Sequence, residues 1–114
     1  MLKGLFRQRS AERDRDNDAA RAERIVSLLA GIRIELEQER KGLQERYDRT
    51  VGNASTLSFA IDGEGASDWS DRKLKDLESG MIYCETRTRS IAEFDKEIAQ
   101  LQDAAEKLLQ RRKA

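Results

Sequence analysis

The chain has 114 residues with no proline, no histidine and one cysteine, and 39% of its residues are charged. This length allows one domain, and a highly charged composition without proline favours long helices over a mixed fold. The 22 basic residues balance the 22 acidic ones, so no net charge attracts nucleic acid or an anionic membrane.

Residues 1–17 form a charged segment ahead of the expected helices. The first ten residues contain three bases, Lys3, Arg7 and Arg9, and no acid. This pattern is typical either of a solvated terminus or of a short amphipathic anchor for an anionic membrane. From residue 11 onward the charges alternate in sign without an apolar stripe, which leaves exposed helix and disorder both open for this segment.

A first helix is expected from about residue 18 to about residue 51. Its apolar stripe changes phase after Leu36, because a strict heptad counted from Ile25 would place Glu39 and Arg46 between the helices. Either a local unwinding or polar layer follows there, or these two side chains flank the helix contact with their charged ends in water. The stripe consists of Ile25, Leu29, Ile32, Leu36, Leu43, Tyr47 and Val51.

The connection between the helices is expected over about residues 52–69. Gly52 and Asn53 predict a helix end, because both residue types tolerate the left-handed conformation. Residues 54–61 fit either a continued helix or an extended strand. The following sequence, Asp-Gly-Glu-Gly at residues 62–65, is typical of a turn, so the chain is expected to reverse direction here.

A second helix is expected from about residue 70 to about residue 110. Ser70 is its predicted N-cap, with Trp69 and Leu74 forming a hydrophobic staple. The stripe is perturbed near Phe94, where the regular position falls on Asp95. Small or apolar residues otherwise recur at spacings of three and four, which is the pattern of a coiled coil: Leu74, Leu77, Met81, Cys84, Thr88, Ile91, Ile98, Leu101, Ala105 and Leu108.

These elements predict an all-α fold, a long antiparallel two-helix coiled-coil hairpin over residues 18–112. One narrow helix contact cannot bury all of the apolar residues, so we expect two hairpins to dimerise into a four-helix bundle. The expected oligomer core is Ile25, Leu29, Ile32, Leu36, Leu43, Tyr47, Leu74, Leu77, Met81, Cys84, Ile91, Ile98, Leu101 and Leu108.

The sequence offers little catalytic or metal chemistry. Without histidine it lacks the usual general base and the ordinary zinc ligand sets, and Cys84 has no imidazole to activate its thiol. Calcium is not expected at the acidic turn, because the sixth and twelfth positions counted from Asp62 are Ser67 and Lys73 rather than Gly and Glu. We therefore expect no enzyme activity and no cofactor. One cysteine and the absence of a long apolar run favour a cytoplasmic location.

The local placement of charge separates two functional hypotheses. Residues 52–71 contain four acids and no base, whereas both chain ends are basic, so the hairpin is expected to have an acidic tip and a basic open end. The first hypothesis is a scaffold or adaptor that engages itself and an unidentified protein. The second is a peripheral regulator that binds anionic membrane or nucleic acid through its basic end, although no reading helix or aromatic platform supports DNA. The basic residues are Lys3, Arg7, Arg9, Arg111, Arg112 and Lys113.

The helical-hairpin format resembles two groups of small proteins. In the WXG100-type secreted proteins the loop carries Trp-x-Gly, where this chain has Trp69-Ser70-Asp71. The other group comprises coiled-coil stalk or chaperone-escort subunits of flagellar and type III export systems. That resemblance implies an export chaperone or stalk role by analogy of fold alone.

Overall fold

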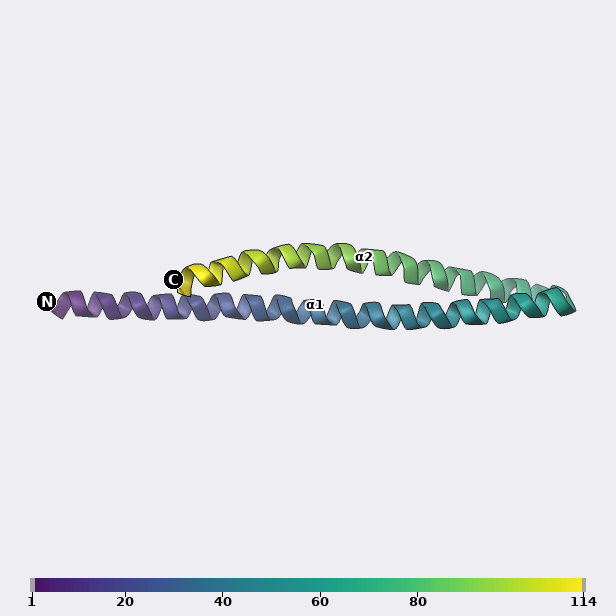
Figure 1. The fold of residues 1–114 in the computed structure, drawn as a ribbon, viewed down its shortest axis with the longest axis horizontal. Helices are drawn as coiled ribbons and strands as arrows, with labels where there is room; N and C mark the ends of the chain where they lie inside the picture. Colours follow the sequence, from purple (N-terminus) through teal and green to yellow (C-terminus); the bar gives the residue numbers. More distant parts are fainter. Residues whose placement is uncertain (1, 114) are drawn as a thin grey trace. The chain divides into compact units, whose positions relative to one another are not determined.

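The computed structural model describes the backbone of residues 2–113 and the side chains of residues 8–113. Two helices, α1 (Leu2–Glu64) and α2 (Asp68–Lys113), account for nearly all of this chain, and the described residues contain no strand. The helices run antiparallel and form the predicted hairpin (Figure 1). The α1 helix begins at Leu2 rather than near residue 18, so the predicted charged segment continues the helix.

The two helices meet along a regular heptad seam. In α1 the more buried positions alternate at spacings of four and three from Ala22 to Ile61, and in α2 they do so from Ser70 to Arg112. We call these the seam positions. The α1 seam keeps its spacing through Leu36, so the predicted change of phase is absent. The apolar stripe suggested such a change because polar side chains occupy some of the seam positions. The α1 seam comprises Ala22, Val26, Leu29, Arg33, Leu36, Arg40, Leu43, Tyr47, Thr50, Ala54, Leu57 and Ile61.

The α1 helix continues through Gly52, where the sequence predicted its end. Gly52 is exposed and has no neighbouring side chain within 4 Å of a Cβ built there, so it points away from α2. The next seam positions, Ala54, Leu57 and Ile61, are half-buried and extend the same four–three spacing. Their packing outweighs the helix-propensity cost of one glycine, about 1 kcal/mol. Residues 54–61 are therefore helical, and the predicted connection over residues 52–69 shortens to three residues.

The helix end lies at Gly65 instead. This residue has a φ of 93°, and its N–H donates to the Ile61 carbonyl oxygen at 2.8 Å. A left-handed glycine that closes a bond of this kind is a common way for a helix to terminate. Of the two segments that suggested a turn, Gly52-Asn53 and residues 62–65, only the later one contains the residue at which the chain reverses.

The α2 helix is capped by Ser67 rather than by Ser70. The Ser67 Oγ accepts a hydrogen bond from the Ser70 N–H at 3.1 Å, and the Ser70 Oγ accepts one from the Ser67 N–H at 2.8 Å. This reciprocal pair has the geometry of a capping box, with serine where glutamate is usual. Trp69 consequently lies inside the first turn and is 63% exposed, so the predicted staple with Leu74 does not form.

The hairpin divides into two units, each built from both helices. Unit 1 is Met1–Glu35 with Asp95–Ala114, and unit 2 is Leu36–Phe94. The core of unit 2 is formed by Leu43, Cys84 and Ile91, with Leu36 and Tyr47 packed against it. In unit 1 the most buried apolar side chains are Ala22, Ile98 and Ala105. Two of those are alanines, so this part of the seam buries little apolar volume.

Candidate functional site

A polar layer interrupts the seam of unit 1. Arg33 donates from Nε to Asp95 Oδ1 at 2.9 Å and from Nη2 to Asp95 Oδ2 at 3.2 Å. Its remaining nitrogen, Nη1, donates to Gln102 Oε1 at 3.1 Å. These bonds to Asp95 raise the pKa of Arg33, so the guanidinium stays charged. The layer occupies three seam positions. Counting spacings of four and three from Ala22, without regard to whether the residues are apolar, would have placed Arg33 in the seam.

We expect this layer to set the register of the two helices. Asp95→Leu should lower the denaturation midpoint, because Arg33 then faces an apolar side chain without its carboxylate. The double variant Arg33→Leu/Asp95→Leu should recover the midpoint, since a continuous apolar seam replaces the ion pair. Thermal denaturation followed by circular dichroism measures both. A double variant as unstable as the single one would show that the layer stabilises the fold by itself.

Polar contacts in unit 2 flank the seam instead. Arg87 donates from Nε to Glu39 Oε2 at 2.7 Å and from Nη2 to Glu39 Oε1 at 3.1 Å. The Arg46 guanidinium carbon lies 5.4 Å from the centre of the Tyr83 ring, a cation–π distance. Glu39 and Arg46 are both exposed. Of the two alternatives for this pair, the flanking arrangement is therefore the correct one.

The Arg87–Glu39 bond has a consequence at low pH. It lowers the pKa of the Glu39 carboxyl below its usual value of 4.5, so the folded chain binds fewer protons there than the unfolded chain. The stability that this bond adds to the folded chain is fully present above pH 4.5 and is lost as the pH falls through the pKa of Glu39 in the folded chain. Glu39→Gln should therefore flatten the fall in denaturation midpoint between pH 6 and pH 3. Glu45→Gln, at an exposed position outside any ion pair among the described residues, is the control.

Most of the predicted oligomer core lies between the two helices of one chain. Leu43, Cys84, Ile91 and Ile98 are buried. Ile25 and Leu101 are exceptions, with 44% and 56% of their surfaces exposed. The rest of the predicted set is half-buried: Leu29, Ile32, Leu36, Tyr47, Leu74, Leu77, Met81 and Leu108.

The predicted basic end is not one continuous surface. The side chains of Lys3 and Arg7 lie outside the described residues. Arg9 is exposed on α1, and Lys113 at the end of α2 lies 3.8 Å from Glu23. Arg112 and Lys113 also line a pocket with Glu12 and Asp16, which lie about one and two turns along α1 from Arg9. Acidic side chains therefore lie between Arg9 and the basic end of α2.

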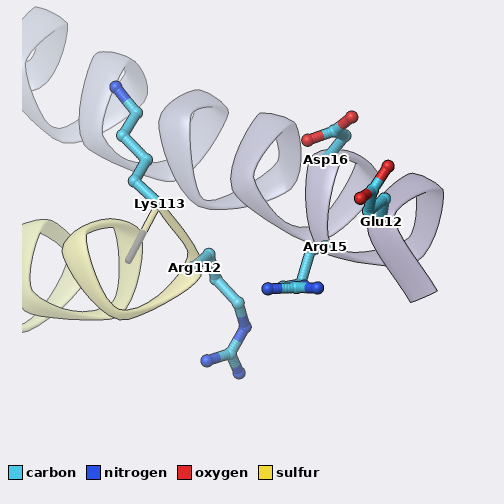
Figure 2. Close-up of a pocket in the computed structure, with 5 residues that line it drawn as sticks. All are labelled: Glu12, Arg15, Asp16, Arg112 and Lys113. Carbon is cyan, nitrogen blue, oxygen red and sulfur yellow. The ribbon is translucent and has the colours of Figure 1, made fainter. Parts of the chain in front are cut away.

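Acidic residues accompany the bases where α2 ends. An open pocket of about 230 Å³ is lined by Glu12, Arg15, Asp16, Arg112 and Lys113. Figure 2 shows the guanidinium groups of Arg15 and Arg112 below α1 in this view, and the carboxylates of Glu12 and Asp16 pointing upward from the same helix. Two acids beside three bases reduce the local field, so this pocket is a weak attractor for phosphate.

Large apolar side chains are exposed on both units. Leu28, Ile34 and Leu101 are the most exposed in unit 1, and Phe59, Trp69 and Ile82 are the most exposed in unit 2. Phe59 reaches 82% and Leu28 65%. More than half of the surface of each of these side chains is exposed, so that surface is available to a further contact. Of these six, the predicted oligomer core contained only Leu101, although Leu28 and Ile34 were among the surplus apolar residues that led to the expectation of self-association.

Metal sites and membrane spans were also sought over the described part of the chain. Within it, no three Cys, Asp or Glu side chains are placed to hold a metal ion. Neither α1 nor α2 contains, over the same residues, a stretch long and apolar enough to cross a bilayer.

A comparison with protein-family models, curated proteins and solved structures finds no match to this chain. What the protein does is therefore inferred from its own residues and contacts.

Proposed function

We propose that this protein is a non-enzymatic coiled-coil scaffold or adaptor that acts by binding other protein surfaces. The observation that supports it most directly is the set of six large apolar side chains exposed on both units, from Leu101 at 56% to Phe59 at 82%. Large exposed apolar side chains on an otherwise charged surface favour contact with another protein. We place this activity in the cytoplasm, a reducing compartment, because the chain has a single cysteine and it is buried.

A helical hairpin suits such a role. Its seam contacts hold the two helices together with ion pairs and small apolar residues, so the outer faces are left for other surfaces. The side chains that reach outward from these faces are carried on helices, whose backbone hydrogen bonds keep them at fixed spacings. A partner therefore meets a pre-organised array of side chains and loses little affinity to ordering.

The test is capture of a defined partner by photo-crosslinking in the source cell. A photoreactive residue replaces Ile34 in one variant and Ile82 in another, because both side chains are exposed and each lies on a different unit. Crosslinking to one protein species, identified by mass spectrometry and lost when the other of the two isoleucines is changed to Asp, supports the proposal. The control site is Glu45, which is also exposed.

An adaptor role fails if neither apolar position crosslinks to protein and the purified chain instead binds anionic vesicles in a salt-sensitive way. That result would favour the peripheral regulator, whose binding would depend on the basic residues of the chain ends.

A further inference from the structure

One edge of unit 1 carries an apolar strip. On α1 it comprises Ile25, Leu28 and Ile32, and on α2 it comprises Leu101, Ala104 and Leu108. Each set is spaced by three and four residues, so its members lie on one side of their helix. Ile25, Leu28 and Leu101 are 44%, 65% and 56% exposed.

Heptad position puts both halves of the strip on the same edge. In an antiparallel coiled coil the residues that precede the seam on one helix face those that precede it on the other. Likewise, residues that directly follow the seam face each other on the other edge, as Glu23 and Lys113 do in unit 1. Ile25, Ile32, Leu101 and Leu108 each directly precede a seam position, so they lie on the opposite edge of unit 1.

The polar layer fixes which residues lie level with one another. Arg33 bonds to both Asp95 and Gln102, so it lies level with a point midway between them. Because the helices are antiparallel, moving about five residues back along α1 and about five residues forward along α2 from that point places Leu28 level with Ala104. One heptad from this centre, Arg21 lies level with Arg111 in one direction, and Glu35 lies level with Glu97 in the other.

The strip is therefore bounded by two bases at one end and two acids at the other. All four side chains are exposed. Arg21 contacts Asp18 within its own helix at 2.9 Å, an exposed pair that leaves guanidinium donors available. Among the described residues no ion pair engages Arg111, Glu35 or Glu97.

We propose that a second copy of this chain covers the strip, related by a two-fold axis that crosses both helices at Leu28 and Ala104. Each helix then packs against its own counterpart in the antiparallel direction. Arg21 meets Glu35 of the other copy, and Arg111 meets Glu97 of the other copy, because each pair lies at equal distances from the axis. This inference rests on the proposed function and names one surface and one partner for it.

The charges reject the other face-to-face two-fold arrangement. An axis parallel to the helices would bring the same ends of the two copies together. Arg21 would then face Arg111 of the other copy, and Glu35 would face Glu97. Like charges placed opposite each other disfavour that pairing, so the strip is self-complementary in one orientation only.

The size of the strip predicts a weak dimer. From Arg21 to Glu35 it is about 21 Å long at 1.5 Å per residue. A face of this length on two helices buries less than the roughly 800 Å² per partner of a standard stable interface. We therefore expect the dimer to dissociate in the micromolar range or above, where the charged ends decide its orientation.

Charge reversal gives a decisive experiment. The variants Arg21→Glu/Arg111→Glu and Glu35→Arg/Glu97→Arg each place like charges at every contact of the dimer. Sedimentation equilibrium of the full chain should show a dissociation constant at least tenfold larger for each variant alone. An equimolar mixture of the two should recover association as a heterodimer, because every contact then joins opposite charges.

Matched controls separate this effect from net charge. Arg24→Glu/Lys107→Glu and Glu45→Arg/Glu93→Arg carry the same net charges as the two variants but alter exposed positions off the strip. They should dimerise like the original chain, and circular dichroism should show unchanged helicity for all variants. A monomeric original chain up to millimolar concentration overturns the inference, as does a mixture that forms no heterodimer. Neither result affects crosslinking to another protein at Ile34 or Ile82, which tests the proposed function separately.

Discussion

Ile91→Ala is expected to lower the free energy of unfolding by about 3 kcal/mol, the cost of deleting most of a buried isoleucine side chain. Ile91 is 2% exposed and lies in the unit 2 core beside Leu43 and Cys84. A two-helix contact has few other buried side chains to share that loss. Urea denaturation followed by circular dichroism measures the change.

Ile82→Ala provides the control on the same helix. Ile82 is 62% exposed, so the same deletion should change the free energy of unfolding by about 0.5 kcal/mol or less. If Ile91→Ala is unfolded in buffer, Ile91→Val, with an expected loss of about 1 kcal/mol, supplies the measurement. Equal losses at positions 82 and 91 would contradict the assignment of the seam.

Gly52→Ala and Gly65→Ala should have opposite effects on stability. Gly52 lies in the exposed interior of α1, and alanine there should stabilise the chain by about 1 kcal/mol. Gly65 has a φ of 93°, a conformation that costs alanine about 1 kcal/mol or more. Neither change meets a neighbouring atom within 4 Å, so backbone conformation alone sets the sign.

The same pair of variants distinguishes two positions for the chain reversal. If the helix ended at Gly52, as its sequence suggests, alanine there would be destabilising and alanine at Gly65 would have a smaller effect. Thermal and urea denaturation of both variants, compared with the original chain, decide between these positions. A matched loss at both glycines would indicate two turns.

The hairpin and most of the α2 seam could be predicted from the sequence, because Leu74, Leu77 and their successors repeat at regular intervals. The end of α1 could not, since local glycine propensity at Gly52 competes with packing at Leu57 and Ile61 that is visible only once the partner helix is in place. The predicted connection was too long, and the predicted cap was placed at Ser70 instead of Ser67, as part of that same error.

The polar layer was missed for a different reason. The regular stripe position in α2 was placed on Asp95, but a search for apolar stripes assigns its partner Arg33 to the surface, because charged side chains seldom occupy a seam. Only the two helices together reveal that the charges are complementary and at the same level. The charge symmetry of the strip around Leu28 likewise depends on the register, which neither helix specifies alone.

The regular four–three spacing of the seam positions restricts how a chain of this kind can change in length. A single inserted residue rotates everything beyond it by about 100° around the helix and moves the following seam residues to the outside. Seven residues inserted in one helix keep its own seam aligned but leave the other helix one heptad short beyond that point. Seven residues added to both helices at the same level keep every contact, so lengthening of this hairpin should proceed by paired heptads.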